Sequence, residues 1–213
     1  MNFCKDLMPL YAVTDRSWLK GRTLYEQVEE ALKGGATLIQ LREKELDDEA
    51  FLKEACEMLK LCEKYGVPLI INDRVDIAVK SGAAGVHIGQ HDLPAAKVRE
   101  MIGPDRVMGV SAVNVEQAVK AEQDGADYLG VGAVFSTSTK LDADNVSYDT
   151  LKAICRAVSI PVVAIGGITK DNISRLKGSG IAGVSVVSAV FAAEDVERAA
   201  KELREIVRNE LQV

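Results

Sequence analysis

Short apolar runs alternate with segments of helical period from one end of the chain to the other. The runs predict eight buried strands, at residues 10–15, 37–42, 68–72, 85–89, 107–111, 128–134, 161–165 and 183–187. The segments between them predict helices at about 23–33, 47–65, 75–81, 93–102, 115–124, 148–158, 171–177 and 195–211. Strands that are apolar throughout are covered on both faces, as in a parallel sheet.

Strict alternation of eight strands with eight helices predicts an α/β fold, a single (β/α)8 TIM barrel over residues 1–213. The alternative is an open doubly wound sheet, which needs fewer strands and usually a glycine-rich first turn. The first turn here reads Thr14-Asp15-Arg16, which favours the barrel. No linker or shift in composition divides the chain, so we expect one domain.

The third and fourth predicted strands each end near a carboxylate. The third ends in Asn72 and Asp73, and the fourth ends just before Asp92. A strand, a helix and a second strand in this order are parallel, so both aspartates are expected at the same edge of the sheet. Two carboxylates beside an amide suit Mg²⁺ that also holds a substrate phosphate. The alternative is that each aspartate caps the helix after it.

Cations follow the second predicted strand. Period-two alternation turns Gln40, Arg42 and Lys44 towards the barrel mouth and the leucine between the first two away from it. Arginine offers a planar fork and lysine a point charge, a pair that suits a diphosphate. The neighbouring Glu43 and Glu45 are expected to be solvated loop residues.

Strands seven and eight end in residues that suit a second anion. Gly166 and Gly167 follow strand seven, and Ser188 follows strand eight. Phosphates in such barrels often lie at these two loops, where glycine lets backbone N–H groups approach closely. The hydroxyls and lysine at 137–140 form a polar loop that could close over a substrate, although a solvated turn would look the same. His87 is expected to be a hydrogen-bonded interior residue.

Composition and charge narrow the functional classes. The net charge of −6 and the pI near 5.1 argue against a nucleic-acid surface. No signal peptide and no membrane-spanning run is recognisable, so a cytoplasmic protein that acts on small molecules is expected. The four cysteines show no metal-binding spacing and are expected to be reduced thiols. The sequence leaves a homo-oligomer open.

Nine short motifs in this order and spacing resemble the thiamine-phosphate synthase family, also called thiamine-phosphate pyrophosphorylase. They are L-Y-A-V-T-D, Q-L-R-E-K, I-N-D-R, G-V-H-I-G-Q-x-D-L, G-V-S, G-A-D-Y-L-G-V-G, T-x-T-K, I-G-G-I and V-S-V-V-S-A. The resemblance runs from Tyr11 to about Ala189. It implies the joining of 4-amino-2-methyl-5-(diphosphooxymethyl)pyrimidine to 4-methyl-5-(2-phosphoethyl)thiazole, or its carboxylated form, with release of diphosphate. Diphosphate would leave first, and the thiazole nitrogen would capture the resulting cation.

The resemblance also implies roles for individual residues. Those implied to contact the pyrimidine diphosphate are Gln40, Leu41, Arg42, Glu43, Lys44, Asn72, Ser111 and Lys140. The catalytic set among them is Arg42, Lys44, Ser111 and Lys140, and Mg²⁺ would be held by Asp73 and Asp92. The thiazole phosphate would be held by Thr137, Ser138, Thr139, Gly167, Val187 and Ser188.

Three departures from the family pattern concern loops. Ser136 stands where proline usually precedes T-x-T-K, His91 stands where an acidic or small residue is common, and 141–147 follows no usual pattern. Three other functions remain open. A thiazole tautomerase would need the phosphate site but not the paired aspartates, and a non-catalytic phosphate sensor would have lost the metal ligands or the diphosphate cations. An unrelated phosphate-binding barrel, such as an epimerase, would need a general acid or base at a strand end, for which only Asp15 and Glu43 are spare.

Overall fold

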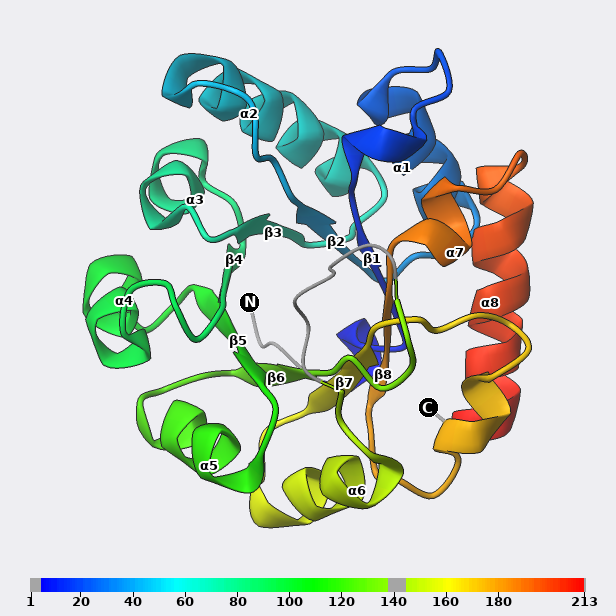
Figure 1. Ribbon diagram of the computed structural model, residues 1–213. Helices are drawn as coiled ribbons and strands as arrows, with labels where there is room; N and C mark the ends of the chain where they lie inside the picture. Colours follow the sequence, from blue (N-terminus) through cyan, green and yellow to red (C-terminus); the bar gives the residue numbers. More distant parts are fainter. Residues whose placement is uncertain (1–4, 138–144, 213) are drawn as a thin grey trace.

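The strands form a closed parallel barrel in the order of the sequence (Figure 1). The computed structural model describes residues 5–137 and 145–212. The strands are β1 Leu10–Val13, β2 Leu38–Leu41, β3 Leu69–Asn72, β4 Gly85–Ile88, β5 Val107–Ala112, β6 Tyr128–Val131, β7 Val162–Ile165 and β8 Gly183–Val186. β8 pairs with β1, which closes the barrel. The predicted (β/α)8 fold is confirmed.

Helices surround the barrel on the outside (Figure 1). They are α1 Leu24–Lys33, α2 Asp48–Lys64, α3 Val75–Ser81, α4 Ala95–Ile102, α5 Val115–Gln123, α6 Tyr148–Ala157, α7 Ser188–Phe191 and α8 Val196–Leu211. Three 3-10 turns complete the described elements: η1 Lys5–Leu7, η2 Arg16–Trp18 and η3 Ile173–Leu176. No helix in 5–137 or 145–212 is long and apolar enough to cross a bilayer.

Local sequence signals set the helix starts. Thr23 and Glu26 form a reciprocal capping box at the start of α1. The starts of α2, α5 and α6 have a simpler cap, in which one side-chain oxygen accepts a backbone N–H; the capping residues are Asp47, Asn114 and Ser147. Two predictions differ from the structure. The helix predicted at 171–177 is only the 3-10 turn η3, and the four-residue α7 was not predicted because one turn is too short to show a period.

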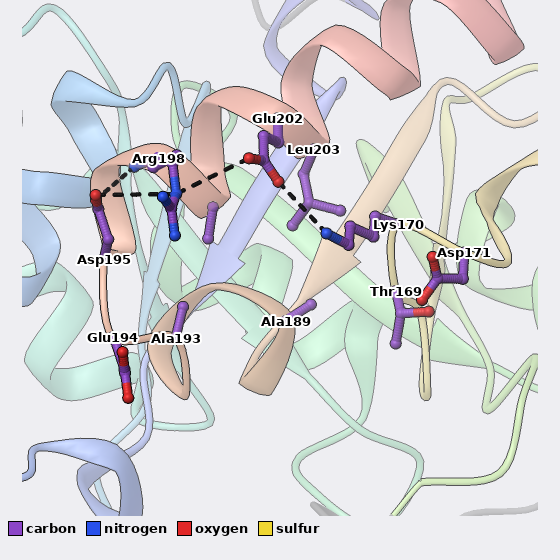
Figure 2. Close-up of a pocket in the computed structure, with 11 residues that line it drawn as sticks. Thr169, Lys170, Asp171, Ala189, Ala193, Glu194, Asp195, Arg198, Glu202 and Leu203 are labelled. Carbon is purple, nitrogen blue, oxygen red and sulfur yellow. Dashed lines mark hydrogen bonds and ion pairs between the residues drawn. The ribbon is translucent and has the colours of Figure 1, made fainter.

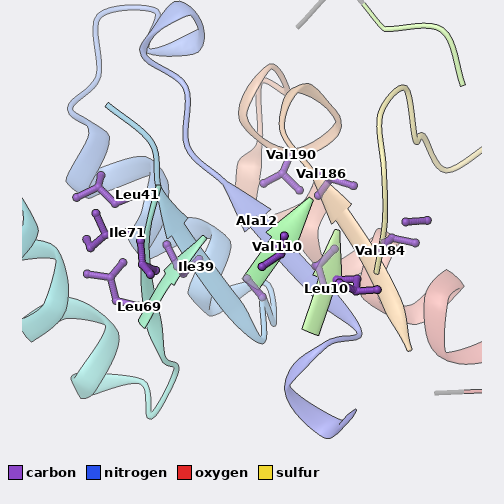
Figure 3. Close-up of a cluster of buried hydrophobic side chains, with 14 of the residues drawn as sticks. Leu10, Ala12, Ile39, Leu41, Leu69, Ile71, Val110, Val184, Val186 and Val190 are labelled. Atoms are coloured by element: carbon purple, nitrogen blue, oxygen red, sulfur yellow. The ribbon is translucent and has the colours of Figure 1, made fainter. Parts of the chain in front are cut away.

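Alternate strand residues build two separate cores. Leu10, Ala12, Ile39 and Ile71 face the helices and belong to the large outer core (Figure 3). The intervening residues fill the barrel itself, where Tyr11, Leu38, Ile70, Val107, Tyr128 and Val163 form a second buried cluster. These inner residues precede Gln40, Asn72 and Ser111 on their strands, so the apolar plug lies below the polar strand ends. The barrel is therefore closed beneath the site.

Two glycines inside the barrel make room for an aromatic pair. A Cβ at Gly109 would lie 2.1 Å from Cζ of Tyr128 and 2.5 Å from Nδ1 of His87. A Cβ at Gly130 would lie 3.0 Å from Cε1 of His87. Glycine in a strand often marks such a close approach. The sequence of β5 and β6 thus allows His87 and Tyr128 to share the barrel interior.

Candidate active site

The polar ends of β2 to β5 meet at the C-terminal mouth of the barrel. Strand pairing places Asn72 beside His87, and His87 beside Gly109, two residues before Ser111. Gln40 is 5% exposed on β2. The Asn72 side chain makes no hydrogen bond with any residue in 5–137 or 145–212. An amide at this edge is thus available to a ligand.

A chain of hydrogen bonds crosses the barrel below the mouth. Gln40 Nε2 donates to the Tyr11 hydroxyl at 2.6 Å, and the Tyr11 and Tyr128 hydroxyl oxygens are 2.8 Å apart. The Tyr128 oxygen lies 2.9 Å from Nδ1 of His87, and Nε2 of His87 lies 3.0 Å from Oγ of Ser111. The predicted role of His87 as a hydrogen-bonded interior residue is confirmed.

Burial keeps this chain uncharged. It lowers the pKa of His87 to about 4, although the charge of Asp73 works in the opposite direction. Burial also raises the pKa of Tyr11 and of Tyr128 above the usual value for a phenol. At neutral pH both phenols and the imidazole are therefore neutral.

The paired aspartates approach each other at the ends of β3 and β4. Burial raises the pKa of Asp92, and the neighbouring Asp73 carboxylate raises it further. Lys44 Nζ lies 2.7 Å from Oδ2 of Asp73, and Gly89 N–H donates to Oδ2 of Asp92 at 2.7 Å. Asp73 has φ +61, a conformation that non-glycine residues seldom adopt and that often marks a functional site.

The helix-cap alternative for these aspartates is not supported. Arg74 is the residue at the N-cap position of α3, and Pro94 is at that of α4. Neither helix start receives a side-chain cap bond. Asp73 contacts a lysine and Asp92 contacts a loop amide instead, so both carboxylates face the mouth loops rather than their own helices.

The loop after β2 holds its cations in ion pairs. β2 ends at Leu41, so alternation no longer applies to the residues beyond it. Arg42 Nη1 lies 3.3 Å from Oδ2 of Asp15, and Lys44 contacts Asp73 as described. Leu41 is fully buried in the outer core, so only its main chain can reach a ligand. The loop presents both predicted cations near the mouth.

The prediction that Glu43 is solvated is wrong. Its side chain is 2% exposed, pairs with Arg16, and accepts N–H groups of its own loop at 2.8 and 3.2 Å. Burial opposes ionisation, but Arg16 and the loop amides hold the pKa of Glu43 below its usual value. Arg16 also lies 2.5 Å from Glu54, whose pKa burial raises. Glu43 therefore anchors the loop that carries Arg42 and Lys44, whereas Glu45 is exposed as predicted.

The turn after β7 is shaped for close backbone approach. Gly166 and Gly167 have φ +96 and +63, and a Cβ on Gly167 would lie 2.3 Å from the Ser136 carbonyl oxygen. Asn172 Nδ2 donates to the Gly167 carbonyl oxygen at 2.8 Å and so fixes the turn from the other side. Val187 and Ser188 are half-buried where β8 leads into α7. The Gly166-Gly167 turn and the start of α7 thus lie at the ends of neighbouring strands.

A hollow of about 310 Å³ lies outside this turn, between residues 169–171 and the start of α8 (Figure 2). Lys170 and Arg198 each pair with Glu202, at 3.7 and 3.9 Å. Four carboxylates and two cations line the hollow, so its charge disfavours a phosphate. We do not regard it as the active site.

Three predicted site residues, Ser138, Thr139 and Lys140, lie outside the described residues. Thr137 is described and half-buried. Sequence reasoning missed Tyr11 and Tyr128, the two buried phenols under the site. The available signal was strand parity, which puts Tyr11 on the same face of β1 as Val13, paired to Gln40.

Comparisons with known proteins agree on one family. A family model described as thiamine monophosphate synthase matches residues 10–190. A thiamine-phosphate synthase of Clostridium tetani is 54% identical over 194 residues, which cover 91% of this chain and 93% of the relative. One of Ruminiclostridium cellulolyticum is 54% identical over 200 residues, covering 94% and 95%.

Solved structures extend the agreement to the fold. The thiamine phosphate pyrophosphorylase of Pyrococcus furiosus matches with a TM-score of 0.90 and 40% identity, over 97% of this chain and 98% of that chain. A 3-hexulose-6-phosphate synthase, at 19% identity and a TM-score of 0.66, shares the fold alone. Sequence motifs, barrel and mouth residues therefore lead to one conclusion: the chain belongs to the thiamine monophosphate synthase family, transferases that join a pyrimidine diphosphate to a thiazole phosphate.

Proposed function

We propose that the two substrates occupy two anion sites of this barrel mouth and that Mg²⁺ is held by Asp73 and Asp92. The observation that carries the proposal is the approach of these two carboxylates, with Lys44 on one of them, at the ends of neighbouring strands. A bare pair of carboxylates would repel. A divalent cation between them and a substrate diphosphate would remove that repulsion.

The donor set suits magnesium better than a metal held by protein alone. Within 5–137 and 145–212 no group of three or more His, Cys, Asp or Glu residues could hold a metal ion. Magnesium usually binds through one or two carboxylates and takes its other ligands from water and substrate phosphate. When bound, it would offset the charge that develops on the departing diphosphate.

The protein's own cations would take the rest of that charge. Arg42 and Lys44 are held near the mouth by Asp15 and Asp73, and the diphosphate would replace or join these carboxylates. Preorganised cations of this kind stabilise charge that develops in the transition state. Lys140 would add a further positive charge. Asp15 and Glu43, the carboxylates that follow β1 and β2, are both paired with arginines, which supports a reaction without a general base.

The second anion would bind between β7 and β8. Gly167 is held in a left-handed turn that lets a phosphate approach the backbone, and the Ser188 hydroxyl lies at the end of the neighbouring strand. Thr137, Ser138, Thr139 and Val187 would complete this site. The thiazole phosphate would then face the cation formed at the pyrimidine, with the two phosphates held apart on opposite arcs of the mouth.

A product assay tests the proposal. Purified protein would receive the pyrimidine diphosphate and the thiazole phosphate with Mg²⁺, and any thiamine phosphate would be oxidised to its fluorescent thiochrome form. We expect product that EDTA abolishes and excess Mg²⁺ restores. Product unaffected by EDTA would refute the metal assignment, and conversion of a thiazole carboxylate isomer without product would favour a tautomerase.

Two lysine variants sharpen the assay. Lys44→Ala should lower turnover about 100-fold or more, as for other preorganised charge-stabilising donors. Lys33→Ala is the matched control, because it removes a similarly exposed lysine, in the last turn of α1, whose ion pair among the described residues is with Glu29. Equal activity of the two variants would exclude Lys44 from the mechanism.

A further inference from the structure

We propose that Tyr11 and Tyr128 are positioning residues that transmit one direction of hydrogen bonding from Gln40 to Ser111. In this arrangement they fix His87 in its Nε2–H tautomer and leave the Ser111 proton for the barrel mouth. The substrate part of this inference rests on the proposed function; the proton order does not.

The direction begins at Gln40. Its Nε2 lies 2.6 Å from the Tyr11 oxygen, and an amide nitrogen can only donate. The Tyr11 oxygen therefore accepts this bond. Its single proton remains for its other partner, the Tyr128 oxygen at 2.8 Å. Tyr11 thus donates to Tyr128.

The same count continues through the imidazole. The Tyr128 oxygen accepts from Tyr11 and donates to Nδ1 of His87 at 2.9 Å. Nδ1 can accept only if it carries no proton, so the proton of the neutral ring lies on Nε2. Nε2–H then donates to Oγ of Ser111 at 3.0 Å. The two phenols thereby determine which nitrogen of His87 is protonated.

Ser111 is the last residue in this series of hydrogen bonds. Its hydroxyl accepts from His87, and no acceptor for its own proton is found among residues 5–137 and 145–212. Ser111 lies two residues beyond the glycine that makes room for the tyrosine ring, at the polar edge of β5. Its proton is free to meet an acceptor atom of the pyrimidine substrate. If every hydrogen bond in the series ran in the opposite direction, Ser111 would donate to His87, and only its oxygen, an acceptor, would face that substrate atom.

Packing alone does not require these hydroxyls. The two rings meet edge to face with their centroids 5.9 Å apart, and they lie among Leu38, Ile70 and Val107. Two phenylalanine rings would fill the same space equally well. Burying two phenols in an apolar cluster is costly unless both are hydrogen-bonded. If the two tyrosines bonded only to each other, their hydroxyls would merely satisfy one another inside the core. The series of hydrogen bonds instead runs from Gln40 to Ser111, two residues of the barrel mouth.

Nitrogen NMR of the ligand-free protein tests the proton order. The chain has only two histidines, His87 and His91, so ¹⁵N-histidine labelling gives two rings, and His91→Gln assigns them. We expect the wild-type His87 to show a protonated Nε2 and an unprotonated Nδ1 at neutral pH. A protonated Nδ1 would overturn the proposal. The measurement leaves all five hydrogen-bonded residues, Gln40, Tyr11, Tyr128, His87 and Ser111, unchanged.

Three matched Tyr→Phe variants test the tyrosines. Tyr128→Phe removes the donor to Nδ1 and should shift both ring nitrogens of His87, with a smaller shift for Tyr11→Phe. Tyr65→Phe, at the C-terminal end of α2, loses a 3.0 Å hydrogen bond to Glu29 and should cause no shift in the His87 signals. Unchanged His87 signals in Tyr128→Phe would overturn the proposal.

Kinetics tests the link to the substrate. Tyr128→Phe should raise KM for the pyrimidine diphosphate about fivefold to tenfold with little change in kcat, the size expected for one weakened hydrogen bond. An unchanged KM would overturn the substrate role of the Ser111 proton. The expected tautomer without any thiamine phosphate product would support the proton order and refute the proposed function, so the two failures are distinguishable.

Discussion

The close contact between Gly109 and the Tyr128 ring leads to a stability prediction. Gly109→Ala adds one methyl group, whose carbon would lie 2.1 Å from Cζ, 2.3 Å from the hydroxyl oxygen of Tyr128 and 2.5 Å from Nδ1 of His87. No side chain accepts contacts this short. The ring of Tyr128 must therefore move away from His87, and the 2.9 Å bond between them breaks.

Three contributions set the magnitude. Overpacking a filled core costs about 1–3 kcal/mol. A buried hydroxyl that loses its partner costs about 1–3 kcal/mol more. Alanine regains about 0.4–1 kcal/mol because it restricts the unfolded chain. The sum is a loss of about 3 kcal/mol in the free energy of unfolding, which for a chain of this length lowers Tm by roughly 6–12 °C.

Gly130→Ala is the matched control. Gly130 faces the same interior from β6, but its added Cβ would lie 3.0 Å from one ring carbon of His87, which a small ring rotation relieves. We expect a change within about 1 kcal/mol. Urea unfolding followed by circular dichroism should show a lower midpoint for Gly109→Ala at an unchanged slope.

A double-mutant cycle identifies the cause. In a Tyr128→Ala background the ring is absent, so the cost of Gly109→Ala should shrink by roughly 1–2 kcal/mol. Equal losses for Gly109→Ala and Gly130→Ala, or no coupling with Tyr128→Ala, would refute the steric argument.

Two further predictions concern the histidine and the strained aspartate. Because folding lowers the pKa of His87 from 6.5 to about 4, its contribution to stability is complete above pH 6.5 and is lost as pH falls towards 4, by up to about 3 kcal/mol. Urea titrations between pH 7 and 4 should show a smaller loss for His87→Gln; an equal loss would contradict the assignment. At Asp73, where φ is +61, Asp73→Gly should be about 1 kcal/mol more stable than Asp73→Ala, although both lose Mg²⁺-dependent activity. Equal stability of these two variants would show that the backbone strain is not local to this residue.

The barrel could be predicted from the sequence because both of its signals, apolar strand runs and helical periods, lie within short stretches of the chain. Unbroken apolar runs separated by helical periods gave the number, order and approximate position of the strands, and the glycines and caps gave the turns. The resemblance supplied the family, and the parallel strands explain why Asp73 and Asp92, 19 positions apart, meet at one edge. Among the predicted elements, the errors fell on short ones such as η3, where one turn carries no period.

The tertiary structure decided which polar residues are partners. Glu43 is charged and lies in a polar loop, so local sequence favours solvation, yet Arg16 from 27 positions away buries it. Tyr11 and Tyr128 look like ordinary strand aromatics, and only barrel closure brings their hydroxyls within 2.8 Å across 117 positions. Hydrogen bonding depends on distance and direction in space, which spacing along the chain does not contain. The sequence by itself thus determined where the strands end, and the closed barrel determined which side chains meet there.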